Sequence, residues 1–263
     1  MSIRGIIKCY IKFIKDEISL LLYRISGLKE ENLRELRSLQ DIHKGKRGFI
    51  ICNGPSLKCE DLDKIYSYDE ISIASNKIDK IFTKTRWRPT YYIVMDEAYQ
   101  YSLLDTMIAV PAKKKFFRIE SFITTRKVKD NCVWLKADGD RKLLENPRFS
   151  EDCSDVIYTI ATVTFSMIQL YVHMGIREIY IIGCDNSYGR EIAKDGNIIN
   201  HGTSSYFAGS SLKDLNHAAA TWEMNIAYEY ARKYADEHGI KIYNATRGGH
   251  LEAFERVNFD SLF

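Results

Sequence analysis

The sequence predicts a doubly wound α/β fold with a mainly parallel sheet, preceded by an amphipathic N-terminal helix. From about residue 44 onward, short apolar runs of strand length alternate with longer segments of helical periodicity. Strands that alternate with helices through short connections form parallel sheets with helices on both faces. Hydrophobic residues make up 45% of the 263-residue chain, which is enough for the core of one large domain.

Residues 1–43 are expected to form a helical segment ahead of this domain. Apolar residues recur at helical spacing within residues 3–25, and a basic stripe accompanies them, made of Arg4, Lys8, Lys12 and Lys15. Charged residues interrupt the apolar clusters, so this is neither a signal peptide nor a spanning helix. Three roles stay open for it: packing on the domain, contact with a second subunit, or a peripheral position on the inner face of a membrane. A polar helix over residues 30–42 follows as a spacer.

The domain is predicted to span residues 44–263, and its first strand is the apolar run at residues 48–52. Further strands are expected at residues 71–75, 91–95, 115–118, 132–136, 178–182 and 240–243. Helices are expected from residue 59 and over residues 97–110, 161–174 and 213–238.

Charge and cysteine usage narrow the functional classes. The chain carries 38 basic and 35 acidic residues, a balance that does not favour a nucleic-acid partner. None of its six cysteines forms a Cys-x-x-Cys pair or has zinc-ligand spacing. The pattern is typical of buried thiols in a reducing compartment, so we expect a cytoplasmic location without structural disulfides.

A polar turn, Asn53-Gly54-Pro55-Ser56, directly follows the first predicted strand. Ligands of open α/β sheets bind at the carboxyl ends of the strands. Gly54 permits close approach of the backbone, and Ser56 can cap the next helix, whose N-terminus can receive a phosphate. An ordinary strand-to-helix connection explains the turn equally well when it is taken alone.

Other predicted strands also end in polar residues: Asn76, Asp96, and Gly183 with Asp185. In a parallel sheet these ends lie on one edge. Such a set of amides and carboxylates suits ribose hydroxyls, base edges and phosphates.

Residues 186–212 form a long segment that we expect to act as a lid over this edge. His201 is its best candidate for a general base, because imidazole titrates near neutrality. His217, farther along the chain, is the rival base. Tyr188 and Tyr206 can donate phenolic hydrogen bonds to a leaving phosphate.

No Asp-x-Asp sequence follows a predicted strand; its spacing occurs only at Asp61/Asp63 and Asp138/Asp140. Metal-dependent sugar transferases often hold their cation with such carboxylates. The pattern therefore favours hydrogen bonds as the means of stabilising a leaving group. Esterase, zinc-protease and P-loop motifs are also missing from the sequence.

The run from Ile50 to Leu57 resembles the opening motif of two related bacterial groups. One is the 6-hydroxymethylpterin pyrophosphokinase-like family, which includes the core of flagellin glycosyltransferases, and the other is the small CMP-sialyltransferases. Three further stretches are similar: residues 178–185, Asn200-His201 with Tyr206-Phe207, and residues 240–249. The resemblance covers roughly residues 44–260. Cys52 stands where these groups usually carry Gly.

The resemblance implies a variant Rossmann-like glycosyltransferase domain that inverts configuration without a metal. The nucleotide sugar, CMP-activated, would be a co-substrate with no separate cofactor, and the acceptor a surface glycan or lipid-linked glycoconjugate. The residues expected around the nucleotide are Asn53, Gly54, Pro55, Ser56, Asn76, Asp96, Thr162, Gly183 and Asp185. Tyr188 and Tyr206 would steady the departing phosphate, and His201 would take the acceptor proton.

Two alternative functions stay open. The first is ATP-dependent diphosphate transfer to a pterin alcohol, which needs Mg²⁺ and clustered carboxylates. The second is non-catalytic nucleotide binding, in which replacement of His201 would leave the cellular phenotype intact.

Overall fold

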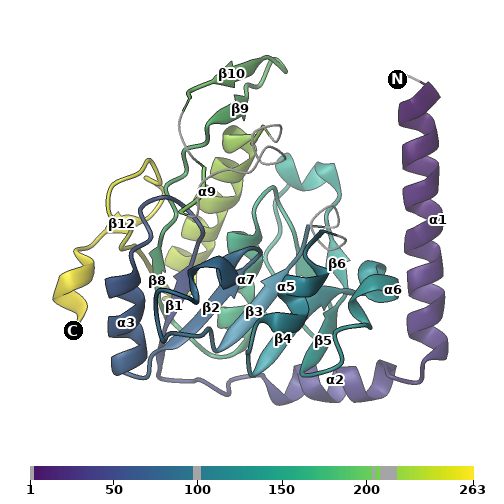
Figure 1. The fold of residues 1–263 in the computed structure, drawn as a ribbon, viewed down its shortest axis with the longest axis horizontal. Coiled ribbons are helices and arrows are strands. Elements are labelled where there is room, and N and C mark those ends of the chain that lie inside the picture. The colour runs from purple at the N-terminus through teal and green to yellow at the C-terminus, as the bar shows by residue number, and fades with distance from the viewer. Residues whose placement is uncertain (1–2, 97–101, 203–204, 208–217) are drawn as a thin grey trace.

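The fold is built on an eight-stranded sheet with the strand order β12-β11-β8-β1-β2-β3-β4-β5 (Figure 1). The structure, a computed structural model, describes residues 3–96, 102–202, 205–207 and 218–263. The sheet's strands are β1 (Arg47–Ile51), β2 (Ile71–Ser75), β3 (Tyr91–Val94), β4 (Lys114–Arg118), β5 (Cys132–Leu135), β8 (Glu178–Ile182), β11 (Lys241–Asn244) and β12 (Glu255–Arg256). Its neighbours pair in parallel throughout the described residues. The predicted doubly wound α/β fold is confirmed.

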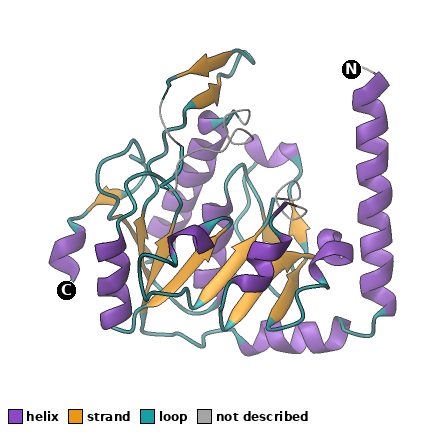
Figure 2. Ribbon diagram, in the orientation of Figure 1, coloured by secondary structure: helices purple, strands orange, loops and turns teal. Residues whose placement is uncertain are grey.

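Helices cover both faces of the sheet (Figure 2). On one face lie α3 (Cys59–Ser67), α5 (Leu104–Ala109) and α6 (Phe122–Thr125). On the other lie α7 (Val163–His173) and α9 (Thr221–Glu237). Because successive residues of a strand point to opposite faces, each face has its own buried apolar cluster.

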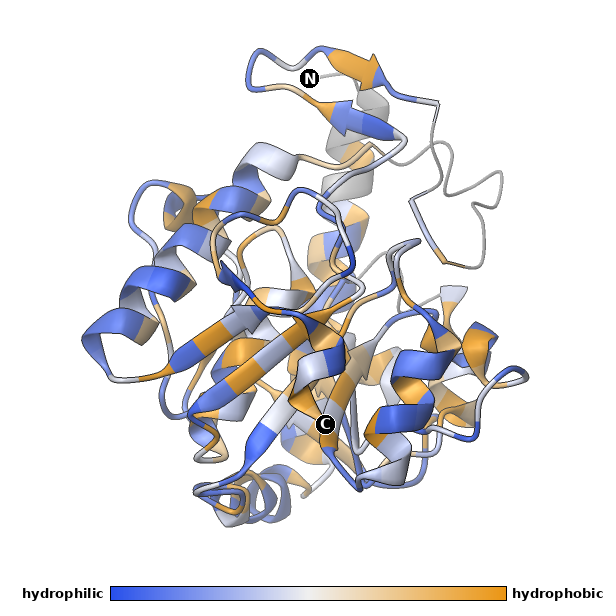
Figure 3. Cartoon of the chain, turned by 90° about the vertical axis from the view of Figure 1, so that its left-hand side faces the viewer, coloured by the Kyte–Doolittle hydropathy of each residue, from blue (hydrophilic) through white to orange (hydrophobic). Residues whose placement is uncertain are grey.

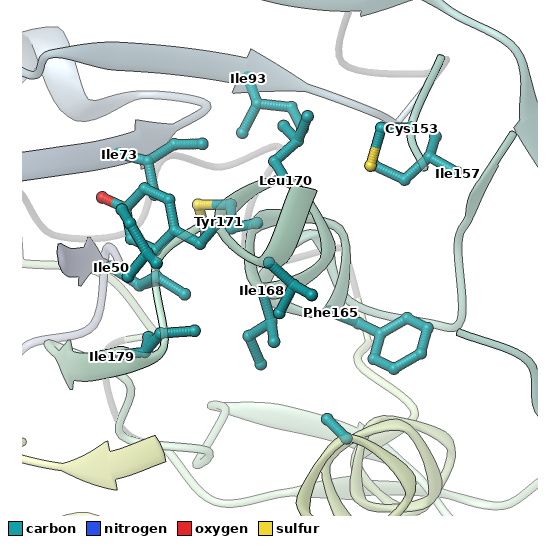
Figure 4. Packing of buried hydrophobic residues seen from close by; sticks show 14 of the residues in the cluster. Ile50, Ile73, Ile93, Cys153, Ile157, Phe165, Ile168, Leu170, Tyr171 and Ile179 are labelled. Carbon is teal, nitrogen blue, oxygen red and sulfur yellow. The ribbon is translucent and has the colours of Figure 1, made fainter. Parts of the chain in front are cut away.

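Strand β1 illustrates the division of the core. Phe49 packs in the cluster beneath α3, whereas Ile50 packs in the cluster beneath α7. Figure 4 shows Tyr171 of α7 close to Ile50 and Ile73 in this second cluster. Hydrophobic residues accordingly gather along the strands in Figure 3, whereas hydrophilic residues are more frequent on the outer helices.

Two helices precede the sheet, α1 (Ile3–Ile25) and α2 (Lys29–Ser38). The amide of Asn32 in α2 donates to the carbonyl of Trp134 at 2.8 Å and accepts from its backbone N–H at 2.7 Å. Helix α2 thereby pairs the backbone N–H and carbonyl of Trp134, which the edge strand β5 would otherwise leave without partners. Among the described residues, no helix combines the length and apolar character needed to cross a bilayer.

Several element boundaries differ from the sequence expectation. The polar helix expected to reach residue 42 ends at Ser38, and turns continue to residue 45. The helix expected over residues 213–238 runs from Thr221 to Glu237 in the described part of the chain. The segment expected to be irregular contains an antiparallel hairpin, β9 (Arg190–Ile192) and β10 (Ile198–Asn200). A short parallel pair, β6 (Ala137–Asp138) and β7 (Ile157–Tyr158), was also not predicted.

A phenol in the core makes the stability of the fold pH-dependent. Tyr91 is buried and shares a 2.7 Å hydrogen bond with Nε2 of His43. Burial raises the pKa of the Tyr91 phenol to about 12, whereas the unfolded value is about 10. Between these values the unfolded state loses a proton that the folded state keeps, so the free energy of unfolding falls as pH rises through that window. We expect the melting temperature to fall between pH 10 and 12, and to fall less in Tyr91→Phe. Equal slopes in the two proteins would contradict this assignment.

Candidate active site

The candidate site lies at the carboxyl edge of the sheet, between β1 and β8. From β1 the chain proceeds outward through β2, β3, β4 and β5, and it then returns to place β8 on the other side of β1. Connections that leave two adjacent strands in opposite directions open a crevice at the strand ends, where ligands of such sheets bind. A pocket occupies this crevice. It is lined by Cys52, Asn53, Gly54, Ser75, Asn76, Thr162, Val163, Thr164, Gly183, Cys184, Asp185, Asn186, Ser187, Tyr188, Ser205, Tyr206 and Tyr228.

Gly54 brings the ends of β1 and β8 into direct contact. Its backbone N–H donates to the carbonyl of Gly183 at 2.8 Å. A Cβ atom at position 54 would lie 2.0 Å from Oδ2 of Asp185 and 2.6 Å from the Gly183 carbonyl oxygen. No residue but glycine fits there without displacing the turn.

Asp185 and Ser56, both expected near the nucleotide, bind each other. Oδ2 of Asp185 accepts from the backbone N–H of Ser56 at 3.2 Å and from its hydroxyl at 2.8 Å. The carboxylate therefore fixes the turn that begins at Gly54. Pro55 is exposed, and neither Pro55 nor Ser56 lines the pocket.

Three residues that line the pocket have a buried amide oxygen without a partner in the described part of the chain: Oδ1 of Asn53, Oδ1 of Asn76 and Oδ1 of Asn186. The amide nitrogen of Asn53 is fixed by donation to the Ser75 carbonyl at 3.0 Å. Asn76 has a left-handed backbone, with φ of 52°, and the Tyr92 hydroxyl donates to its carbonyl at 2.7 Å. An unpaired buried acceptor costs free energy, and a ligand that brings N–H or O–H groups would relieve that cost.

The N-terminus of α7 forms another wall. Thr162 caps the helix, its hydroxyl accepting from the backbone N–H of Thr164 at 3.3 Å. The same hydroxyl lies 3.2 Å from that of Tyr228 in α9. Both threonines line the pocket, so the partial positive charge of this helix end is directed to it. Thr162, which the family resemblance places near the donor, therefore lies in the wall of the pocket.

A thiol pair forms the floor of the pocket. Sγ of Cys52 lies 3.4 Å from the Thr164 hydroxyl, and Sγ of Cys184 lies 3.4 Å from the Tyr228 hydroxyl. A hydrogen bond with Cys184 and burial raise the pKa of the Cys52 thiol, so Cys52 stays neutral and is a poor nucleophile. Sequence reasoning identified both thiols as buried but did not place them at the site.

The segment after β8 brings both predicted tyrosines to the pocket. Tyr188 and Tyr206 line it, and the backbone N–H of Phe207 donates to the Asn53 carbonyl at 3.0 Å. The ring of Tyr206 also lies 5.6 Å from the Lys77 ammonium. A cation and two phenols thus lie at one side of the pocket, where negative charge on a leaving phosphate would be stabilised.

His201 lies at the end of β10, outside the pocket lining. Its side chain is 43% exposed, and its Nε2 is 3.7 Å from Oε2 of Glu191. Glu191 also accepts from the backbone N–H of Tyr188 at 3.3 Å and from the Thr221 hydroxyl at 3.1 Å. This carboxylate links the hairpin to the pocket wall. The sequence alone did not indicate Glu191 as a site residue, because only the pairing of β9 with β10 brings it close to His201.

The remaining predicted residues are placed as follows. Gly183 lines the pocket and has a positive φ of 66°. Asp96 is exposed after β3 and does not line the pocket. The rival base His217 lies outside the described residues.

The sequence profile of the 6-hydroxymethylpterin diphosphokinase MptE-like family matches residues 26–191. The chain belongs to this MptE-like family. The resemblance to the 6-hydroxymethylpterin pyrophosphokinase-like group, drawn from the Asn-Gly-Pro-Ser motif, is thereby confirmed. A search of curated proteins found no match to the chain.

The solved structures include one with the same architecture as this MptE-like chain, the MAf glycosyltransferase from Magnetospirillum magneticum AMB-1. The TM-score is 0.53 at 14% sequence identity, over 90% of this chain. The chain spans only 39% of the length of that protein. The likeness therefore establishes a shared fold.

Proposed function

We propose that this chain is a glycosyltransferase that takes a sugar from a nucleotide donor, with CMP as the leaving group, and passes it to a glycan or lipid-linked acceptor. The observation that carries the proposal is the polar pocket at the β1–β8 crevice. There, three amide oxygens without a partner among the described residues lie with the N-terminus of an 11-residue helix. The amide oxygens suit the exocyclic amine of a cytosine or ribose hydroxyls, and the helix end suits a phosphate.

The proposed chemistry is inversion by direct displacement. His201 accepts the proton of the acceptor hydroxyl, the hydroxyl oxygen bonds to the anomeric carbon, and CMP departs with the bonding electrons. Tyr188 and Tyr206 donate hydrogen bonds to the departing phosphate. Metal independence is part of the proposal: the Asp185 carboxylate at the end of β8 already accepts two hydrogen bonds from Ser56.

The direct test is release of CMP from CMP-sugar donors, followed by chromatography with and without EDTA. We expect slow release by hydrolysis without an acceptor and faster release when oligosaccharide acceptors are added, both unaffected by EDTA. No release from any CMP-sugar, together with Mg²⁺-dependent AMP production from ATP and a hydroxymethylpterin, would support diphosphate transfer instead. That alternative is the activity for which the 6-hydroxymethylpterin diphosphokinase MptE-like family is named.

Glu191 is proposed to orient His201. We expect Glu191→Gln to lower kcat roughly tenfold, because the base remains and only its orientation is lost. The dissociation constant of the nucleotide should stay unchanged, and Glu191→Asp should recover part of the rate. Glu151→Gln is the matched control, since Oε1 of Glu151 lies 3.8 Å from Nε2 of His238, a pair away from the pocket. A wild-type kcat in Glu191→Gln would remove the carboxylate from the mechanism.

A further inference from the structure

Helix α1 carries an exposed stripe of apolar side chains. Its members are all aliphatic and between 41% and 70% exposed: Ile7, Ile11, Ile14, Ile18, Leu21 and Ile25. Such residues are normally buried. The stripe runs along most of the helix, whose N-terminal end projects beyond α6 in Figure 1.

The spacing of the stripe is that of a coiled coil. Steps of four and three residues alternate without interruption from Ile7 to Ile25. In heptad notation Ile11, Ile18 and Ile25 occupy the a positions, and Ile7, Ile14 and Leu21 occupy the d positions. At about 100° per residue the six aliphatic side chains fall within a sector of about 80°. Two exposed aromatic side chains of α1, Tyr10 and Phe13, lie to one side of this sector. A helix lying in a membrane interface uses a wider apolar face, whereas a strict a/d seam is the narrower pattern that pairs helices.

The opposite side of α1 is the one that holds it to the domain. Ser19 and Tyr23 are buried, and the Ser19 hydroxyl accepts from the backbone N–H of Ile123 at 3.3 Å. The Tyr23 ring packs edge-on against Phe122, with centroids 5.4 Å apart. On a helical projection both residues lie roughly opposite the stripe. The domain therefore holds the helix so that the apolar stripe faces outward.

The exposed area is sufficient for a stable contact. The six side chains leave on the order of 600 Å² of apolar surface open to water, the upper end for a patch on a monomer. Burial of two such stripes against each other removes on the order of 1,000 Å², the area at which specific interfaces begin. The seam is self-complementary, as an interface between identical subunits requires.

We propose that α1 pairs with α1 of another copy of this chain through a coiled coil formed by these six residues, so that the protein is a homo-oligomer. The Ile-rich a and d positions also suit three strands, so the assembly contains two or three copies. This inference does not depend on the proposed catalytic function.

The test is the mass of the full chain by size-exclusion chromatography with light scattering, from 1 to 100 µM. We expect at least twice the 30.5 kDa chain mass. The double variant Ile11→Lys/Ile18→Lys should elute as a monomer, because two charges enter the seam. Phe13→Lys is the matched control, since Phe13 is also exposed on α1 but lies outside the stripe; it should keep the wild-type mass. A far-UV dichroism spectrum like that of the wild type and a cooperative melting transition would show that all three proteins fold.

A monomeric wild-type protein, or an oligomer that persists in the double variant, would overturn the proposal. So would a monomer that sediments with phosphatidylglycerol vesicles, which would assign the stripe to a membrane surface. If the double variant aggregates, Ile14→Cys serves instead. A bismaleimide reagent should then link two chains through position 14 in yield above that of the wild type and of Phe13→Cys, and equal yields would count against the seam.

Discussion

Replacement of Gly54 by alanine should abolish sugar transfer and nucleotide binding together. The added Cβ would lie 2.0 Å from Oδ2 of Asp185 and 2.6 Å from the carbonyl oxygen of Gly183. The carboxylate is held by Ser56 and the carbonyl belongs to the backbone, so neither can yield cheaply. The turn must move away from β8, and Asn53 moves with it.

The expected magnitudes follow from this displacement. Overpacking of this kind costs about 1–3 kcal/mol, which lowers the melting temperature of a chain of this size by roughly 3–10 °C. A shift of reacting groups by about 1 Å costs on the order of 100-fold in rate. The measurements are thermal melting, calorimetric titration with CMP, and CMP release from the donor.

Gly239→Ala provides the control for Gly54→Ala. A Cβ at Gly239 meets nothing within 4 Å, although its φ of 65° makes alanine strained there. It should lose a little stability and keep wild-type nucleotide affinity. A Gly54→Ala protein that binds and transfers like the wild type would show that the β1–β8 turn is not the donor site.

Replacement of His201 by alanine should abolish transfer but leave nucleotide binding intact. The side chain lies outside the pocket lining and close to Glu191, and its proposed role is to act on the acceptor and not on the nucleotide. Loss of a general base lowers kcat by about 10²–10⁴-fold, while the dissociation constant of CMP should not change. Single-turnover transfer and calorimetric titration separate the two effects.

His238→Ala is the matched control for His201→Ala, because the two imidazoles are almost equally exposed and each lies near a glutamate. We expect wild-type rates from it. A fully active His201→Ala enzyme would refute this mechanism, and His217→Ala would then test the rival base.

The sheet and its polar edge were predictable from local patterns. Each apolar run forms a strand whose ends lie within about two residues of the expected ones. Asn53 and Gly183 lie just beyond the ends of buried parallel strands, as expected. The periodicity of apolar residues and the residue types of turns suffice to predict such features, because these features depend on residues that are neighbours in the sequence. Thr162 was expected near the donor only through the family resemblance, and it caps α7 beside the pocket.

Other parts of the site depend on contacts between distant segments. Tyr228 reaches the pocket only because α9 packs beside α7, and nothing in its helical spacing marks it. The Asp185–Ser56 bond joins residues far apart in the chain, so the sequence did not show that a carboxylate lining the pocket also holds a turn. The hairpin was missed because its strands have only three residues each, too few for a period to appear.

The proposed function requires that the β1–β8 pocket binds a cytidine nucleotide without a metal. The most direct measurement is a thermal-shift titration of the full chain with CMP, CDP, UDP, GDP and ATP, each with and without Mg²⁺. A ligand that binds only the folded state raises the melting temperature by mass action. We predict stabilisation by CMP that is independent of Mg²⁺ and absent in Gly54→Ala. Stabilisation by ATP alone, and only with Mg²⁺, would contradict the claim and assign the pocket to diphosphate transfer.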